Sequence, residues 1–552
     1  MPLKDAAKEL LARGDGLFTK RFPLLTLWQQ CCENFHVMRA DYTRKRHFSE
    51  EFGSYLMTGR PGLAHRDLTN SLPALMRPRD RQWLWARTPD ERINEDSEAR
   101  GYLDWMSRQQ YRAMYDLRAG MVRSLKEADG DYTSVGNAVI SVEANQDRDG
   151  LQIRCWHPRD VVWTEGMDLK INQVHHKLKM PMRDICKRWP GMVSEKFKTD
   201  CAKTPDAEIN VRRIVAPVDE YDLPVKNKAR IKYVSIWIDV DNQTLLEETP
   251  SARIIYVIPR WVTISGSQYA YSPAVIMGMP DARMLQRIAL TMLEAAEKAT
   301  DPPLKAAAEA ISGGVNSGAG MITWVDSDYD ERTGPALEHL LPDAHGVQYG
   351  AAREERVEGN LDATFFLNQL RMPQVTKDMT AYEASKLYEE FQRNSLPLLE
   401  PIEVDYNGNF CTEVFNVCQS IGTFGSPNDV PKILQDQDLR WEFDTPLKAA
   451  AEQAKVFAFS NVTDTVVKGM QVDETIKMNV DWNKATREAI TGVGGADWLL
   501  PVKQVAALQA QHAQQQQAAQ AADQMAHGAD AATGMATAVK SAAEARDAMG
   551  AV

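Results

Sequence analysis

The feature that most constrains this chain is a pair of long helix-type segments that flank a glycine-rich, acidic stretch. The first segment begins at Ser272-Pro273, an N-cap residue followed by a proline at the first helical position, and it ends before Pro302-Pro303. Its apolar residues recur at helical spacing, at Leu285, Ile288, Met292 and Ala296. The second segment spans about 346–370 and repeats apolar residues at Val357, Leu361 and Phe365. This arrangement favours a subunit that lines a tube over a small-molecule enzyme.

A third helix-type segment follows the second after a proline-containing loop. We expect the helices to be interrupted there, because a proline cannot occupy a helix interior and disfavours the helical conformation of the residue before it. The pair Thr380 and Glu383 forms a capping-box pattern, which predicts that the next helix begins at this point. The alternative is an ordinary surface turn between packed helices. The loop residues are Met372, Pro373, Gln374, Val375, Thr376, Lys377 and Asp378.

Before these segments the chain divides into a mostly helical block, about 1–125, and a strand-rich block, about 126–270. The second block contains runs of β-branched and aromatic residues, which predict strands. A loop of turn-forming residues at 145–150 predicts a hairpin. The predicted strands are 138–142, 151–156, 233–238 and 254–258.

The stretch between the first two helices, about 301–345, contains a glycine-rich run, a predicted strand at 321–325 and an acidic run. The glycine run lacks the lysine of a phosphate-binding loop. The acidic run lacks the central glycine and the closing glutamate of a calcium loop in register. We therefore interpret it as a solvated acidic loop or a docking patch for a basic partner. Its candidate docking residues are Trp324, an isolated aromatic anchor, with Asp326, Asp328 and Asp330.

The C-terminal part is predicted to contain a short strand at 439–443 and helices between 447 and 493. Residues 503–552 are rich in alanine, with glutamine concentrated in their first half. Alanine and glutamine are good helix formers, so an exposed helix is one interpretation. A low-complexity tail that is ordered only partly, or only in an oligomer, is the other.

The composition of the chain constrains which partners it can bind and in which cellular compartment it is found. The net charge of the 552 residues is −12, and lysine and arginine are not clustered. Tight static DNA binding is therefore disfavoured, because such binding requires clustered cations. An acidic surface that lets DNA pass and an ordinary acidic protein both remain open. Seven scattered cysteines are typical of a reducing compartment. We expect neither a signal peptide nor a membrane helix, since no apolar run approaches about 20 residues.

Catalytic and metal-binding patterns are not found. His175 and His176 lie in a predicted strand, where adjacent side chains face opposite ways and cannot chelate one ion. Cys411 and Cys418 are seven residues apart on a predicted helix, which indicates one buried face. We predict that the chain is not an enzyme, uses no cofactor and holds no metal.

Several short blocks occur in a fixed order over residues 20–425. They are Leu68–Leu72, Arg77–Trp83, Val135–Ala138, Trp156–Asp160, Tyr256–Trp261, Gly266–Pro273, Glu297–Leu304 and Met379–Ala384. Their succession resembles the portal (head-to-tail connector) proteins of short-tailed, podovirus-type bacteriophages. The chain departs mildly from that pattern in two places. Ala270 stands where the family tends to have glycine, and Tyr382-Glu383 stands where it has Thr-Glu.

The resemblance implies an α+β, predominantly helical portal-type subunit that assembles into a closed ring. Its parts would be a helical and β-rich wing, a two-helix stem, a small α/β clip and a C-terminal helical crown or barrel. The implied boundaries are 1–270 (wing), 271–300 (first stem helix), 301–345 (clip), 346–371 (second stem helix), 372–379 (channel loop), 380–445 (wing helix and strand), 446–502 (crown) and 503–552 (tail).

The resemblance also implies a function and partners. The ring, typically of 12 subunits, would sit at one capsid vertex as the channel for genome packaging and ejection. It would pass double-stranded DNA without sequence specificity. Its protein partners would be the terminase large subunit, then a tail adaptor protein, and the major capsid and scaffolding proteins. The basic stem residues would be Arg283, Arg287, Lys298, Arg353 and Arg356.

Two other classes remain as alternatives. One is another structural ring or scaffold protein of a phage particle. The other is an intracellular enzyme whose site follows none of the common motifs.

Overall fold

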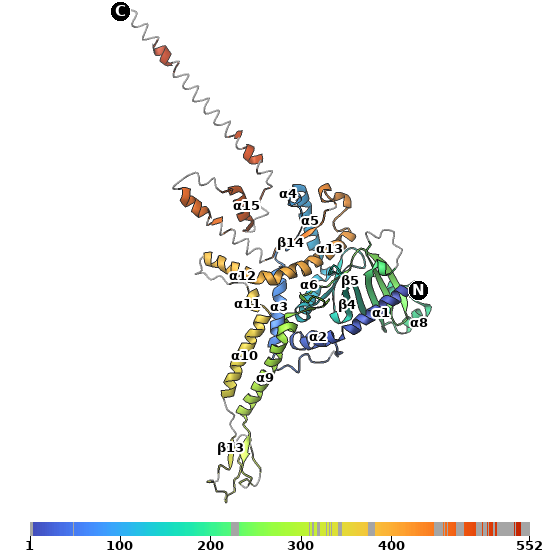
Figure 1. Cartoon of the computed structure of the whole chain (residues 1–552), viewed down its shortest axis with the longest axis vertical. Coiled ribbons are helices and arrows are strands. Elements are labelled where there is room, and N and C mark those ends of the chain that lie inside the picture. Colours follow the sequence, from blue (N-terminus) through green and yellow to red (C-terminus); the bar gives the residue numbers. More distant parts are fainter. Residues whose placement is uncertain are drawn as a thin grey trace, which may run out of the picture. The chain divides into compact units, whose positions relative to one another are not determined.

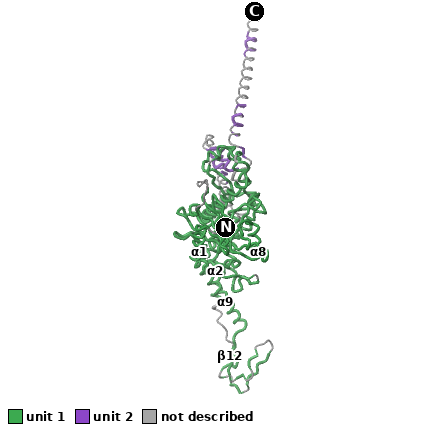
Figure 2. The backbone as a smooth tube through the Cα atoms, turned by 90° about the vertical axis from the view of Figure 1, so that its right-hand side faces the viewer, with its two compact units in different colours: residues 1–450 green, residues 451–552 purple. Residues whose placement is uncertain are grey.

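The computed structural model divides the chain into two units, residues 1–450 and 451–552 (Figure 2). It describes residues 4–47, 49–221, 231–308, 310–311, 314–316, 321–326, 328–330, 332, 334–339, 345–371, 373, 381–435, 437–445, 456, 459–460, 462–470, 480–492, 499–500, 505, 507–511, 514–515, 535 and 537–542. Both helices and strands are present, so the expected mixed class is confirmed.

The N-terminal part of the first unit is helical, as the sequence predicts. Apolar residues at helical spacing are buried in each long helix, for example Leu68 and Leu72 in α3 and Leu103 and Met106 in α5. One short strand, β1 (Leu84–Arg87), interrupts this block and pairs with β14 (Arg440–Phe443). The prediction did not include β1. The helices are α1 (Asp5–Lys20), α2 (Phe22–Phe35), α3 (Arg60–Met76), α4 (Glu91–Glu95), α5 (Ser97–Met114) and α6 (Met121–Val135).

Two antiparallel sheets follow. The three-stranded sheet has the order β3-β2-β9, with β2 (Val139–Ala144), β3 (Leu151–Trp156) and β9 (Tyr256–Val257). The hairpin predicted at 145–150 joins β2 to β3. The five-stranded sheet has the order β4-β5-β6-β7-β8, with β4 (Val161–Glu165), β5 (Ile171–Pro181), β6 (Glu208–Pro217), β7 (Tyr233–Asp239) and β8 (Thr244–Ser251). The strand predicted at 254–258 is only the two residues of β9.

Helix α1 covers one face of the five-stranded sheet, where Ala7 and Leu10 pack on Ile214 and Ile236. Because successive strand residues point to opposite faces, the neighbours Arg213 and Trp237 lie on the other side. Two short helices after β5, α7 (Met182–Arg188) and α8 (Glu195–Lys203), pack against each other beside this sheet.

The long helices of the central segment are present. Helix α9 (Met279–Thr300) follows a π-helical turn at Ala274–Gly278 and ends before Pro302, as predicted. Helix α10 (His345–Thr364) lies alongside α9, and strand β13 (Leu337–His339) lies beyond their far ends (Figure 1). Gly350 makes close approach possible, since a Cβ atom there would lie 2.3 Å from Met292 Sδ of α9.

The sequence predicts one continuous second helix to about residue 370, but the structure divides it in two. Helix α10 ends at Thr364, and the four-residue α11 (Leu367–Leu370) follows. Phe366 between them has φ +57°, a left-handed conformation that is strained for an aromatic residue. Buried Phe365 and stacked Phe366 explain the break, because they contact Phe35 and Trp261 on different elements. Packing of two adjacent aromatic residues overrides the helical periodicity.

The segment between α9 and α10 differs from its prediction. Residues 321–325 form no strand, and the sheet present there pairs β12 (Leu304–Ala306) with β13 (Leu337–His339). The apolar pattern of 321–325 is misleading, because Met321, Ile322 and Trp324 are exposed and have no strand partner among the described residues.

After α11 the chain forms α12 (Ala381–Ile402), a π-helical segment at Glu403–Gly408 and α13 (Asn409–Ser420). Thr380 of the predicted capping box lies outside the described residues. The described parts of the second unit are helical at 456, 459–460 and 462–470 and in α15 (Trp482–Gly492), in agreement with the prediction. Described residues of the alanine-rich tail, such as 507–511 and 537–542, are also helical.

A substitution at Gly136 would test how tightly the end of α6 is packed. It ends α6 with φ +85°, and a Cβ atom at this position would lie 2.6 Å from the backbone nitrogen of Ser272. We expect Gly136→Ala to lower the free energy of unfolding by about 3 kcal/mol or more, since both the left-handed conformation and the backbone clash oppose it. Urea denaturation of the purified protein would measure this.

The control is Gly101→Ala, within α5, where nothing lies within 4 Å of the added atom. This change should stabilise the protein by about 0.5–1 kcal/mol through helix propensity. Equal effects of the two substitutions would contradict the proposed role of Gly136.

Candidate functional site

Two of the blocks that carry the sequence resemblance, Val135–Ala138 and Gly266–Pro273, meet where the long helices leave the rest of the first unit. Asn137 donates to the backbone oxygen of Ala270 (2.8 Å) and accepts from its nitrogen (2.9 Å). Ser272 donates to the oxygen of Ser134 (2.5 Å), and its hydroxyl oxygen also accepts from the nitrogen of Val275. The start of α9 is therefore hydrogen-bonded to the end of α6 through buried side chains.

The same region is closed by Phe35 of α2. Its ring packs against Phe365 at the end of α10, with ring centroids 5.3 Å apart. It also packs on Gly278, at which a Cβ atom would lie 3.0 Å from the ring. One phenylalanine thus contacts the ends of both long helices.

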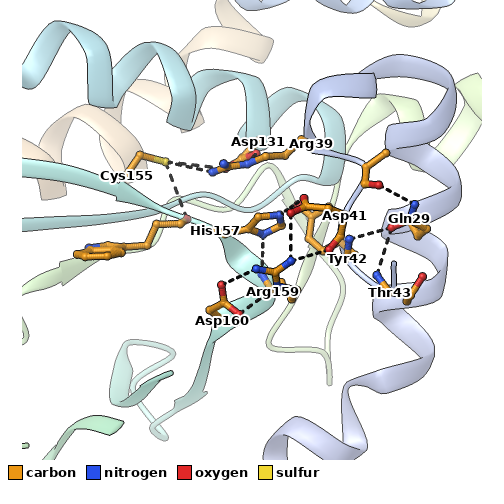
Figure 3. Close-up of polar contacts among 12 residues, drawn as sticks. Gln29, Arg39, Asp41, Tyr42, Thr43, Asp131, Cys155, His157, Arg159 and Asp160 are labelled. Atoms are coloured by element: carbon orange, nitrogen blue, oxygen red, sulfur yellow. Dashed lines mark hydrogen bonds and ion pairs between the residues drawn. The ribbon is translucent and has the colours of Figure 1, made fainter. Parts of the chain in front are cut away.

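The block Trp156–Asp160 holds a polar network (Figure 3). His157 Nε2 lies 2.7 Å from Asp41 Oδ1, and Arg159 donates to the backbone oxygen of Asp41 at 2.7 Å and to its Oδ2 at 3.1 Å. Burial opposes ionisation of Asp41, but the hydrogen bond from His157 and the nearby positive charges outweigh it and lower its pKa. The network joins the segment after α2 to the loop before β4.

Two buried ion pairs extend this network around α6. Arg39 donates to both carboxylate oxygens of Asp131, at 2.8 and 2.7 Å. Arg77 contacts both oxygens of Asp129, at 2.6 and 2.5 Å, and Tyr406 donates to the same carboxylate at 2.9 Å. The Arg39 pair is bidentate, whereas Arg77 makes both contacts through Nη2, and breaking either pair beside a buried carboxylate would be costly. The residues that carry the sequence resemblance are therefore mainly structural joints.

The predicted basic stem residues lie on α9 and α10. Arg283, Arg287, Lys298, Arg353 and Arg356 are all exposed. Arg283 donates to Gln30 Oε1 at 2.9 Å, and Arg353 Nη2 lies 3.6 Å from Met284 Sδ. The structure thus places these cations on two neighbouring helices, accessible to solvent in this single chain.

The predicted docking residues lie in the segment between α9 and α10. Trp324 is 79% exposed, and Asp326, Asp328 and Asp330 are also exposed. Asp326 and Asp330 accept hydrogen bonds from backbone nitrogens two residues further on, as in Asx turns. No group of residues able to hold a metal ion is found in the parts of the chain that are described.

The sequence interpretation missed that Met321, Ile322 and Val325 are exposed together with Trp324, at 65%, 64% and 47%. The run of apolar residues at 321–325 predicts a strand, and the structure forms none there. The signal that argues against this is the glycine-rich run before it and the acidic run after it, which leave the stretch little to pack on. We call Met321, Ile322, Trp324 and Val325 the apolar strip.

The predicted channel loop lies outside the described residues except for Pro373. Its residues Met372, Gln374, Val375, Thr376, Lys377 and Asp378 therefore remain a sequence-based prediction.

The two adjacent histidines of β5 behave as predicted. His176 Nδ1 lies 2.9 Å from the hydroxyl of Tyr256, whereas His175 lies against Gly14 of α1 on the opposite face. Burial lowers the pKa of each imidazole to about 3. Cys411 and Cys418 are both buried on α13, in agreement with the prediction.

Comparison with known proteins identifies the chain. The model of a family described as bacteriophage head to tail connecting protein matches residues 7–499. The chain belongs to this family. The identification made from the sequence blocks is therefore confirmed.

A relative of this connector is the probable portal protein of Bordetella phage BPP-1. It is 22% identical over 550 residues, which cover 95% of this chain and 94% of the relative. Two solved structures are similar at 8% identity. The neck of an empty GTA particle has a TM-score of 0.33 and covers 73% of this chain and 86% of that chain. The virion of a native gene transfer agent particle has a TM-score of 0.34 and covers 78% and 94%.

None of the described helices of the connector is long and apolar enough to cross a membrane.

The buried histidines predict acid sensitivity. His65, His175 and His176 each have a pKa lowered to about 3 by burial, and burial also lowers the pKa of His36. The unfolded chain binds these protons first, so the free energy of unfolding should fall as pH falls below about 6.5. The slope is up to about 1.4 kcal/mol per pH unit for each histidine. Denaturation between pH 8 and 5 would measure it.

Two carboxyl groups change the free energy of unfolding in the opposite direction, over a narrower range of pH. Burial raises the pKa of Glu413 to about 6 and also raises that of Asp405.

The variant His175→Met should reduce the slope of the free energy of unfolding against pH, whereas His47→Gln, which changes an exposed side chain, should leave that slope unchanged. A stability that is constant between pH 8 and 5 would contradict this account.

Proposed function

We propose that this connector is a phage portal protein, a ring at one capsid vertex through which the genome is packaged and later ejected. The observation that carries the proposal is the pair of helices α9 and α10. They extend away from the rest of the first unit, and little of the surface of their outer parts is covered. The buried residues of α9 are Met279, Ala282 and Leu285, all near its start. Leu293 and Tyr349, further out, are 54% and 75% exposed.

Two helices with such exposure gain little stability from packing within one chain, and most helix stability in proteins comes from tertiary packing. Neighbouring copies in a ring would cover them. A closed ring uses a heterologous interface, in which one side of each subunit contacts a different side of the next. We take the ring to have about a dozen subunits, on the family resemblance.

The parts of the subunit follow from the same proposal. Residues 1–270 and 380–445 form the wing, 271–300 and 346–371 the stem, and 301–345 the clip. Residues 372–379 form the loop facing the channel, 446–502 the crown, and 503–552 a tail towards the capsid interior. The exposed cations of the stem would face DNA phosphates, which gives weak contacts that are independent of sequence.

We assign the docking of partners to the apolar strip and its acidic neighbours. Apolar anchors with a charged rim are the composition that protein interfaces favour. The terminase large subunit would dock there during packaging and a tail adaptor protein afterwards. Major capsid and scaffolding proteins would contact the wing.

The first test is assembly. Purified protein should form rings of about a dozen subunits with an axial channel, because uncovered stem helices require neighbours. Native mass spectrometry and negative-stain imaging would measure this. Only monomers and dimers at high protein concentration would count heavily against a portal function and would favour another structural phage component.

The second test concerns docking. Trp324→Ala should weaken binding of the terminase large subunit by about 30-fold or more, the loss typical of an aromatic anchor. Rings should still assemble, because this side chain is 79% exposed within the subunit. Trp105→Ala, which changes a tryptophan of α5 that is 39% exposed, is the control and should bind normally. Unchanged terminase binding by the Trp324 variant would place docking elsewhere.

A further inference from the structure

The short helices α7 and α8 pack against each other, and each carries a cysteine on the shared side. Met182 and Ile185 of α7 are buried, and Cys186, one turn after Met182, continues that face. In α8 the buried residue is Phe197, and Cys201 lies one turn after it. Both cysteines are half-buried and pack against the same apolar cluster.

A backbone hydrogen bond places the two cysteines at the same level. The nitrogen of Arg183, in the first turn of α7, donates to the oxygen of Pro205, just after the end of α8, at 3.0 Å. The two helices therefore run in opposite directions from this joint. Cys186 and Cys201 each lie about one helical turn from it, so they stand opposite each other.

The side chains of the two cysteines contact each other. Burial, and a hydrogen bond with the Cys201 side chain, raise the pKa of the Cys186 thiol to about 11, and the positive charge of Lys198 opposes this shift. A disulfide bond is about 2 Å long, so thiols within hydrogen-bond distance reach it by a small rotation of their side chains. The fold thus positions these two thiols for a bond within one chain.

The other five cysteines have different surroundings. Cys155 Sγ lies 3.8 Å from a carboxylate oxygen of Asp131, and burial and that negative charge raise the pKa of its thiol. The remaining four are buried, and burial raises the pKa of each. These four are Cys31, Cys32, Cys411 and Cys418. Reaction of a thiol requires access to the reagent, so Cys186 and Cys201 combine what the others lack, partial exposure and a thiol neighbour from a second helix.

We propose that Cys186 and Cys201 form an intramolecular disulfide when the protein meets a small-molecule disulfide such as oxidised glutathione. The thiolate of one cysteine attacks a sulfur of the reagent, and one glutathione leaves as a thiolate that takes up a proton. The second cysteine gives up its proton and attacks the mixed disulfide, which releases the second glutathione. The protein loses two hydrogens with their electrons, and the reagent gains them.

The bond would join α7 to α8 over the apolar cluster that contains Phe197, Trp189 and Trp237. A virion protein is made inside a cell, where thiols stay reduced, and it leaves that compartment with the particle. The bond would therefore form after release. This timing rests on the proposed function, whereas the formation of the bond does not, so the two can fail separately.

The test treats purified, folded protein with oxidised glutathione and measures its mass after quenching with acid. The mass should fall by about 2 Da, the two hydrogens lost. Two of the seven thiols should no longer react with a thiol reagent in denaturant. Trypsin should then release the peptides 184–187 and 199–203 as one linked species, which a reductant separates.

Matched variants distinguish this pair from the other cysteines. Cys155→Ser should lose the same mass as the wild type, whereas Cys186→Ser should not lose it. The proposal is overturned if the wild-type mass does not change, if glutathione stays attached to Cys186 or Cys201, or if the bond joins another pair of cysteines or two chains.

Amide hydrogen exchange in α7 and α8 gives an independent measurement. Oxidation should slow exchange in both helices about tenfold or more, because the bond constrains the locally opened state. Cys201→Ser should exchange at the same rate with and without the reagent. Equal exchange in oxidised and reduced wild-type protein would overturn the assignment of the bond to these two helices.

Discussion

The contact on which the rest of the first unit depends is the close approach of the end of α6 to the start of α9. Gly136 makes it possible, because a side chain there would overlap the backbone of Tyr271 and Ser272. Asn137 and Ser272 then replace the solvent hydrogen bonds that the two backbones lose. Since α9 begins in this joint and Phe35 packs on the ends of both α9 and α10, the direction of the two long helices is set by a buried, fully packed site.

The charged residues of the first unit divide into two groups with different physical roles. Arg39 and Arg77 pair with aspartates around α6, where both carboxylates and Arg77 are buried and an unpaired charge is expensive, so these pairs fix the packing of helices. The cations of α9 and α10 named above are exposed in this single chain. Exposed arginines that the fold orients but does not pair are suited to contacts with other molecules. The buried pairs thus hold the fold together, whereas the exposed cations are accessible to other molecules.

The sequence predicts the helices and the long strands well, because their periodicity and turn residues act locally. It fails where packing between distant segments decides. Phe365 and Phe366 continue a helical pattern, yet contacts with Phe35 and Trp261 break the helix between them. Strands β1 and β12 are short and pair with residues far away in the chain, at β14 and β13.

The apolar strip and the long helices both expose surface that another molecule could cover. An exposed apolar surface opposes solubility and persists in a stable subunit only where another molecule covers it. The strip lies between α9 and α10, whose own outer parts are exposed, so covering the helices by neighbouring subunits leaves the strip for a different partner. A ring would cover the long helices of every subunit by repeating one interface. In the proposed ring the strips of all subunits would form a circle of identical anchors, which suits a partner that binds several of them at once and gains affinity from multivalency.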